Sequence, residues 1–257
     1  MRKSLYGEQA DHADMAHVLN NIGASYANLN DKAKAIVYSE KAYQMQKRLF
    51  IKDIEEEDDG DHPDIIETLE NLSAAYSSLN PHTKANEEKS LVYASQAYEM
   101  QSRLFPNVDH PRTARLLLSM AQSNSNLAID ERENANLSKK YETRAVELKL
   151  EAYNMQCLLF NGRHHPDVAT TLQSLGESFR KKRELNEALD YFMRAYEMRK
   201  VLYENKPHKH LLESLRSLDF VYFQMRRENE SCKFREMADE MEEQLEEENK
   251  KKKHSKK

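Results

Sequence analysis

The chain has 257 residues, of which only 5 are Gly and 6 are Pro while 32% are charged, and this scarcity of helix-breaking residues predicts an all-α protein. The net charge is −5, and six of the 39 basic residues are lysines within the last eight positions, so the rest of the chain is more acidic still. This balance gives no support to nucleic-acid binding, which needs a basic face.

Other function classes also find little support. No apolar run approaches the roughly 18 residues of a membrane-spanning helix and no signal peptide is recognisable, so we expect a soluble cytoplasmic protein without membrane partners. The Lys-rich tail leaves nuclear import open as an alternative. Cys157 and Cys232 lack metal-ligand spacing and are expected in the core of a protein from a reducing compartment. No catalytic, phosphate-binding or dinucleotide motif occurs, so neither an enzyme nor a cofactor is expected.

The start of a helix recurs along the chain and is marked by a histidine. Each histidine is followed after seven residues by Leu, then by a further apolar residue, usually a small residue (Asp219 is the exception) and usually an aromatic residue, at i, i+3, i+4 and i+7 spacing. This spacing defines one face of an α-helix, which we term the A helix of a repeat. The five histidines are His12, His62, His110, His165 and His208.

A nine-residue pattern marks a second helix, the B helix. AYQMQKRLF begins at Ala42, and close copies begin at Ala97, Ala152 and Ala195, with a degraded copy at Ala238. A repeat at this spacing predicts stacked helical hairpins, each of which buries its apolar residues against the next one.

The two markers divide the chain into repeats and insertions. The acidic insertion does not match a calcium loop, because Ile66 stands where that loop needs Glu, and the repeated His marks a helix start, so no metal site is expected. The expected order is 1–10, the end of a truncated preceding repeat; 11–50, repeat 1; 51–61, an acidic loop; 62–105, repeat 2; 109–160, repeat 3 with an insertion; 164–203, repeat 4; 207–248, repeat 5; and 249–257, a basic disordered tail.

Small residues recur in a fixed register. In an undisturbed repeat they occupy relative positions 8, 20 and 27, as at Gly23, Ala35 and Ala42, which is typical of tetratricopeptide repeats. The segments DHPDIIETLENLSAAY, HHPDVATTLQSLGESF and ALDYFMRAYEMRKVLY resemble the tetratricopeptide region of the kinesin light chain class. This resemblance implies a right-handed α-solenoid of antiparallel helix pairs, with A helices lining a concave groove and B helices outside.

The residues expected to face that groove occupy relative positions 5, 6, 9, 12 and 13 of each A helix. Most carry amide or hydroxyl groups, which can donate to and accept from an extended peptide backbone. The pair Asn21 and Asn71 resembles the light-chain pattern in which groove asparagines hold the peptide main chain. The candidate binding residues are Asn20, Asn21, Asn28, Asn71, Ser119, Gln122, Asn126, Gln173, Ser174, Arg180, Lys181 and Arg216.

A basic cluster lies toward the C-terminal end of this set. Arg180, Lys181 and Arg216 suit an acidic residue or a C-terminal carboxylate of a partner, and Phe220 and Phe223 are expected to form an apolar pocket beside them. The leading hypothesis is therefore a non-catalytic adaptor that binds a protein or peptide partner. Two alternatives stay open: an assembly module that self-associates through its terminal repeats, and a detached repeat region of a larger motor-associated or sensor protein.

Overall fold

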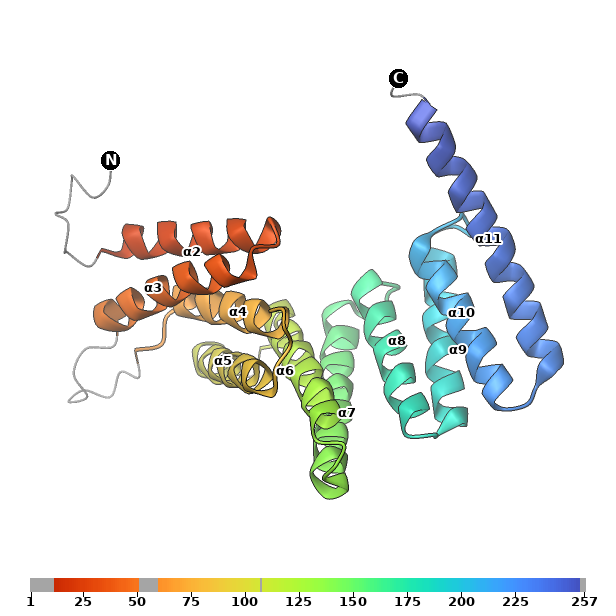
Figure 1. The fold of residues 1–257 in the computed structure, drawn as a ribbon, viewed down its shortest axis with the longest axis horizontal. Helices are drawn as coiled ribbons and strands as arrows, with labels where there is room; N and C mark the ends of the chain where they lie inside the picture. Colours follow the sequence, from red (N-terminus) through yellow and green to blue (C-terminus); the bar gives the residue numbers. More distant parts are fainter. Residues whose placement is uncertain (1–11, 51–59, 107, 255–257) are drawn as a thin grey trace. The chain divides into compact units, whose positions relative to one another are not determined.

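The computed structural model describes residues 12–50, 60–106 and 108–254 (Figure 1). The expected truncated repeat at 1–10, most of the acidic loop and the last three residues of the tail lie outside this range. Within it the chain is all-α, as predicted, and contains no strand. The helices are α2 (Ala13–Asn28), α3 (Lys32–Phe50), α4 (Pro63–Ser77), α5 (Lys84–Leu104), α6 (Pro111–Asp130), α7 (Ala135–Leu159), α8 (Pro166–Lys181), α9 (Leu185–Leu202), α10 (Lys209–Gln224) and α11 (Glu228–His254).

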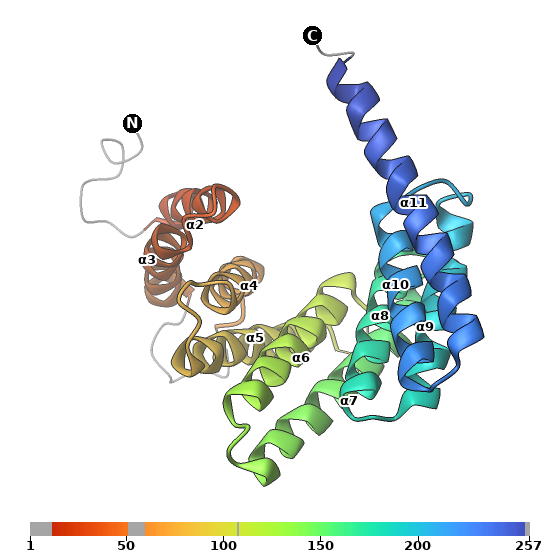
Figure 2. The same ribbon diagram turned by 45° about the vertical axis from the view of Figure 1, so that its right-hand side comes forward.

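Successive helices form antiparallel hairpins, in the order expected of an α-solenoid. The A helices are α2, α4, α6, α8 and α10, and each is followed by its B helix. The fold divides into two compact units, Met1–Leu148 and Lys149–Lys257, and the division falls within α7. In each unit a helix packs on its neighbours in the sequence, as α8 to α11 show in Figure 2.

The recurring histidine begins each A helix by capping it. In all five cases the histidine has an extended backbone, and its Nδ1 accepts a hydrogen bond from the backbone N–H two residues later, at 3.0 to 3.2 Å. This bond satisfies one of the N–H groups that a helix start leaves unpaired. The histidine is thus a structural element, which explains its period.

The same rings join one repeat to the next. The last residue of the nine-residue pattern stacks on the following histidine, with ring centroids 3.9 Å apart for Phe50 and His62 and 3.6 Å apart for Tyr203 and His208. Phe160 and His165 form the same stack at 3.6 Å. The end of each of these B helices is therefore fixed against the start of the next A helix.

The small-residue register lies where helices approach most closely. A Cβ atom on Gly23 would lie 2.4 Å from Ser39 Oγ, and one on Gly176 would lie 2.6 Å from the ring of Phe192. Ala42 and Ala195 are fully buried. The prediction that small residues mark close helix contacts is confirmed at these positions.

Apolar residues from the A and B helices form the core of each unit. In the second unit, Leu211, Leu215 and Leu218 of α10 pack with Phe192 and Tyr196 of α9. In the first, Ile65, Ile66 and Leu69 of α4 form a comparable cluster. Each such side chain contributes roughly 1.5–3 kcal/mol through burial, so the contacts between helices supply most of the stability.

Two expectations about α11 differ from the structure. The helix continues to His254, six residues into the segment expected to be disordered, because Glu246 pairs with Lys250 and Glu247 with Lys251 one turn apart. Cys232 was expected in the core but is exposed, because its neighbour Ser231 takes the buried small position of the repeat. Within the described ranges, no helix combines the length and the apolar character needed to cross a bilayer.

Candidate peptide-binding surface

Position 5 of the A helices lies at the contact between consecutive A helices. Asn20 is buried and its amide donates to Glu67 Oε1 of α4 at 3.1 Å. Gln173 is buried as well and donates to Ser217 Oγ of α10 at 2.6 Å. These side chains hold neighbouring repeats together, so the expectation that they face an open groove is wrong.

Position 6 completes these contacts from the following repeat. The Asn71 amide donates to Asn20 Oδ1 at 3.0 Å, and Ser119 Oγ lies 3.1 Å from Ser73 Oγ. Asn21, by contrast, is exposed. Asn21 and Asn71 therefore do not form the matched pair that the family resemblance implied, since the Asn71 amide is engaged with Asn20.

The exposed surface of the A helices is formed mainly by positions 9, 12 and 13. At position 12 only Phe223 is exposed, and Ala27, Ser77, Ser125 and Arg180 are half-buried. Ser174 of α8, at position 6, is half-buried. The exposed residues at these positions are Asn28, Ala74, Ser78 and Gln122 in the first unit and Lys181, Phe220, Phe223 and Gln224 in the second.

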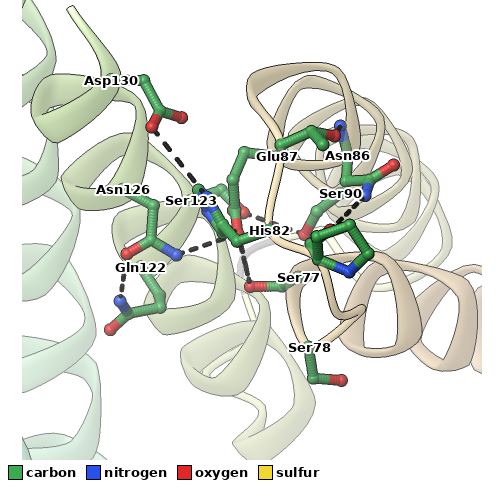
Figure 3. A network of polar contacts seen from close by, with 12 residues as sticks. Ser77, Ser78, His82, Asn86, Glu87, Ser90, Gln122, Ser123, Asn126 and Asp130 are labelled. Carbon is green, nitrogen blue, oxygen red and sulfur yellow. Dashed lines mark hydrogen bonds and ion pairs between the residues drawn. The ribbon is translucent and has the colours of Figure 1, made fainter.

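A buried carboxylate organises the polar residues of the first unit (Figure 3). Glu87 of α5 is fully buried, and it accepts hydrogen bonds from Asn126 Nδ2 at 3.0 Å and Ser77 Oγ at 3.3 Å. His82 Nε2 lies 3.1 Å from the same carboxylate, and Gln122 donates to Asn126 Oδ1 at 2.9 Å. A buried charge is tolerated only with such partners, so Asn126 has a structural role that its groove assignment did not anticipate.

A pocket of about 580 Å³ lies between α8 and α10 in the second unit. This size is within the usual range for ligand sites, roughly 300–1,000 Å³. The pocket brings together the predicted residues Arg180, Arg216 and Phe220, whereas Lys181 and Phe223 are not among its lining residues. The complete lining is Glu177, Arg180, Glu213, Arg216, Ser217, Asp219 and Phe220.

Both arginines of the pocket are already paired within the chain. Arg180 donates through Nε and Nη2 to Glu177 Oε2, at 2.9 and 2.7 Å, and its guanidinium lies 5.0 Å from the Phe220 ring centroid. Arg216 pairs with Asp239 and Glu242 of α11. The expected basic cluster is therefore a pocket of mixed charge with one aromatic wall.

A buried arginine at the repeat junction was not foreseen. Arg199 is 2% exposed, and its Nη1 donates to the His210 carbonyl and to Ser214 Oγ, both at 2.8 Å. Burial lowers the pKa of Arg199, and Glu213 opposes this shift. In repeat 1 the same place is taken by Gln46, which donates to the Asp64 carbonyl. The available signal was a polar residue, Gln or Arg, at position five of every close copy of the apolar pattern.

A buried lysine was missed as well. Lys149 of α7 donates to Ser178 Oγ at 2.8 Å and to the Ser174 carbonyl at 3.3 Å. Burial, with a smaller contribution from nearby Lys181, lowers the pKa of Lys149 to about 8. Nothing in the repeat pattern marks this residue, because the other B helices carry Ser, Ala, Phe or Arg at its position.

These features define an array of tetratricopeptide repeats. A family model described as tetratricopeptide repeat matches residues 15–53 and 168–209, in the first and fourth repeats. The fold is therefore that of tetratricopeptide repeats. No curated protein sequence matches it significantly.

The fold is similar to that of solved structures with kinesin-light-chain repeats. A P. anserina kinesin light chain protein with nearly identical TPR-like repeats is 16% identical, with 92% of this chain and 99% of that chain covered and a TM-score of 0.64. BtubC (BKLC) from P. vanneervenii is 14% identical, covering 91% and 82%, with a TM-score of 0.65. The apo form of RapI is 18% identical, covering 90% and 72%, with a TM-score of 0.64. At these identities the likeness concerns the fold, which is that of kinesin-light-chain-like repeats.

Proposed function

We propose that this protein is a non-catalytic scaffold or adaptor that holds an extended peptide of a partner protein against the exposed face of its A helices. The observation that carries the proposal is the pocket between α8 and α10, where Arg180, Arg216 and Phe220 converge. Tetratricopeptide repeats typically serve as interaction modules, and a solenoid of this kind offers long surfaces for binding.

The pocket offers a partner both apolar and polar contacts. Phe220 is 46% exposed and provides the apolar wall, and Ser217 provides a hydroxyl. Acidic residues of the partner would replace the chain's own carboxylates as the ion-pair partners of Arg180 or Arg216. Each exposed ion pair contributes only about 0.2–1 kcal/mol, so the exchange costs little.

The chemistry of α11 argues against self-association through the last repeat. Asp239, Glu242 and Glu246 stand where earlier B helices carry Tyr, Gln or Arg, and Phe or Tyr for contact with the next A helix. A second copy stacked on this face would meet three carboxylates, which would be costly to bury. We therefore favour the adaptor, and a place within a larger motor-associated or sensor protein stays a prediction. A cytoplasmic location is proposed with it, consistent with two free cysteines.

Selection of peptides from a random display library tests this function. Peptides selected on the wild-type chain should bind the Arg180→Ala and Phe220→Ala variants about tenfold more weakly, because anchor residues in pockets dominate binding. Arg144→Ala is the matched control: Arg144, like Arg180, has a carboxylate partner three residues away on its own helix, but it lies on α7. If no peptide is selected, or if the selected peptides bind both pocket variants as well as wild type, the proposal is wrong.

A further inference from the structure

Arg216 connects the pocket to the final helix. It lines the pocket from α10, while its Nη2 is paired with Glu242 and lies 3.5 Å from Asp239 Oδ1, both on α11. Arg216 and Glu242 each have about half of their side-chain surface exposed, at 48% and 49%. The pair is therefore accessible to a competing charge.

This charge pair replaces a different contact in the preceding repeat. In repeat 4, Arg199 is the fifth residue of the nine-residue pattern on the B helix, and Gln173 is at relative position 5 of the A helix. Arg199 Nη1 lies 3.3 Å from Gln173 Oε1. In repeat 5 the equivalent residues are Glu242 and Arg216, so the cation has moved to the A helix. There it also borders the pocket, which Arg199 does not.

The balance of charge around the pocket depends on this pairing. The lining has three carboxylates and two guanidinium groups, and Glu177 already holds Arg180. Glu213 lies 3.3 Å from Arg199, and Asp219 lies 3.1 Å from Arg235. With Asp239 and Glu242 on Arg216, no guanidinium of the pocket lacks a carboxylate partner in the chain.

We propose that Asp239 and Glu242 compete with acidic residues of the bound peptide for Arg216, and so determine how strongly the pocket selects negatively charged ligands. The proposal rests on the proposed peptide-binding function. Neutralising the two carboxylates leaves Arg216 available to the ligand and makes the pocket more positive. The competing groups are close and partly exposed, so added salt reduces the difference between the variant and wild type.

The test uses the tightest acidic peptide selected on wild type and a copy in which each Asp and Glu is replaced by Asn or Gln. The Asp239→Asn/Glu242→Gln double variant should bind the acidic peptide about two- to fivefold more tightly, the size expected for exposed ion pairs. Its affinity for the neutral copy should not change. Adding Arg216→Ala to the double variant should abolish the gain. Repeating the selection on the double variant should enrich Asp and Glu.

Glu240→Gln/Glu243→Gln is the matched control, because it removes the same number of charges from the adjacent exposed positions of α11. An equal gain in this control would show a general charge effect and overturn the proposal, as would an unchanged affinity of the double variant for the acidic peptide. If Arg180→Ala still weakens the peptide in those cases, the binding function stands and only the competition is refuted. If Arg180→Ala and Phe220→Ala have no effect, the binding function itself fails.

Discussion

Some polar residues within the nine-residue pattern form hydrogen bonds that the helical periodicity of the sequence does not predict. Gln46 and Arg199 occupy the same position of two B helices, and each donates to a first-turn carbonyl of the next A helix. A helical period places such a residue on the buried face, but it does not say which acceptor lies opposite. The role of this position could therefore be read only from the packed structure.

Replacement of Arg199 tests this junction. Arg199→Ala removes the donor to the His210 carbonyl and Ser214 and leaves a cavity, so we expect the free energy of unfolding to fall by about 2–4 kcal/mol. Arg199→Gln restores the residue found in the first three repeats and should cost only about 1 kcal/mol. Urea unfolding followed by circular dichroism gives both values. Equal losses for the two variants would contradict the assigned hydrogen bond.

The burial of Lys149 predicts that the free energy of unfolding depends on pH in an alkaline range. Its pKa falls from an ordinary 10.5 to about 8 in the folded chain, so between these values the unfolded chain binds more protons. The contribution of Lys149 to stability therefore rises as pH increases through this window, and below about pH 8 the charged amine carries the full burial penalty.

Lys149→Met removes that penalty. Ser178 Oγ already donates to the Ser174 carbonyl, so the substitution leaves this acceptor satisfied. At pH 7 we expect the variant to be more stable than wild type by about 1–3 kcal/mol, and this advantage should shrink by pH 9.5. Urea unfolding at pH 7, 8 and 9.5 measures the difference. A constant difference, or a less stable variant at pH 7, would refute the assignment.

At the scale of helices, most boundaries follow from local chemistry. The histidines and prolines located the A helices, because capping and the first-turn preference for proline act within a few residues. The stacking of Phe160 on His165 was not predicted, since the helical period does not relate residues across a loop. The continuation of α11 into the lysines was missed because their i,i+4 pairing with the glutamates was not weighed.

The close approach of α8 and α9 predicts the effect of a single methyl group. Gly176→Ala would place a Cβ atom 2.6 Å from the Phe192 ring, and the clash should exceed the roughly 1 kcal/mol that Ala gains over Gly in a helix. We expect a net loss of about 1–2 kcal/mol in the free energy of unfolding. Phe192→Leu combined with Gly176→Ala should lose less than the sum of the two single variants, measured by a double-mutant cycle. If the losses from Gly176→Ala and Phe192→Leu were strictly additive, the assigned contact between these two residues would be wrong.

At the scale of the molecule, the fold was easier to predict than the site. In a repeat array the contacts run between neighbouring helices, so local patterns specify the architecture. The binding surface depends on how adjacent A helices cross, and this crossing buried Asn20 and Gln173 where the register alone placed them in a groove. Arg180 is paired with Glu177 of its own helix and Arg216 with Glu242 of α11, whereas the sequence presented both arginines as free cations.

Chemical-shift mapping by NMR with a peptide selected on the wild-type chain tests the binding surface most directly. The account predicts that peptide shifts the backbone amides around Arg180 on α8 and around Ser217 and Phe220 on α10, and that the outward residues of α9 stay unchanged. Shifts confined to α9 and the outer face of α11, with the pocket residues unaffected, would contradict it.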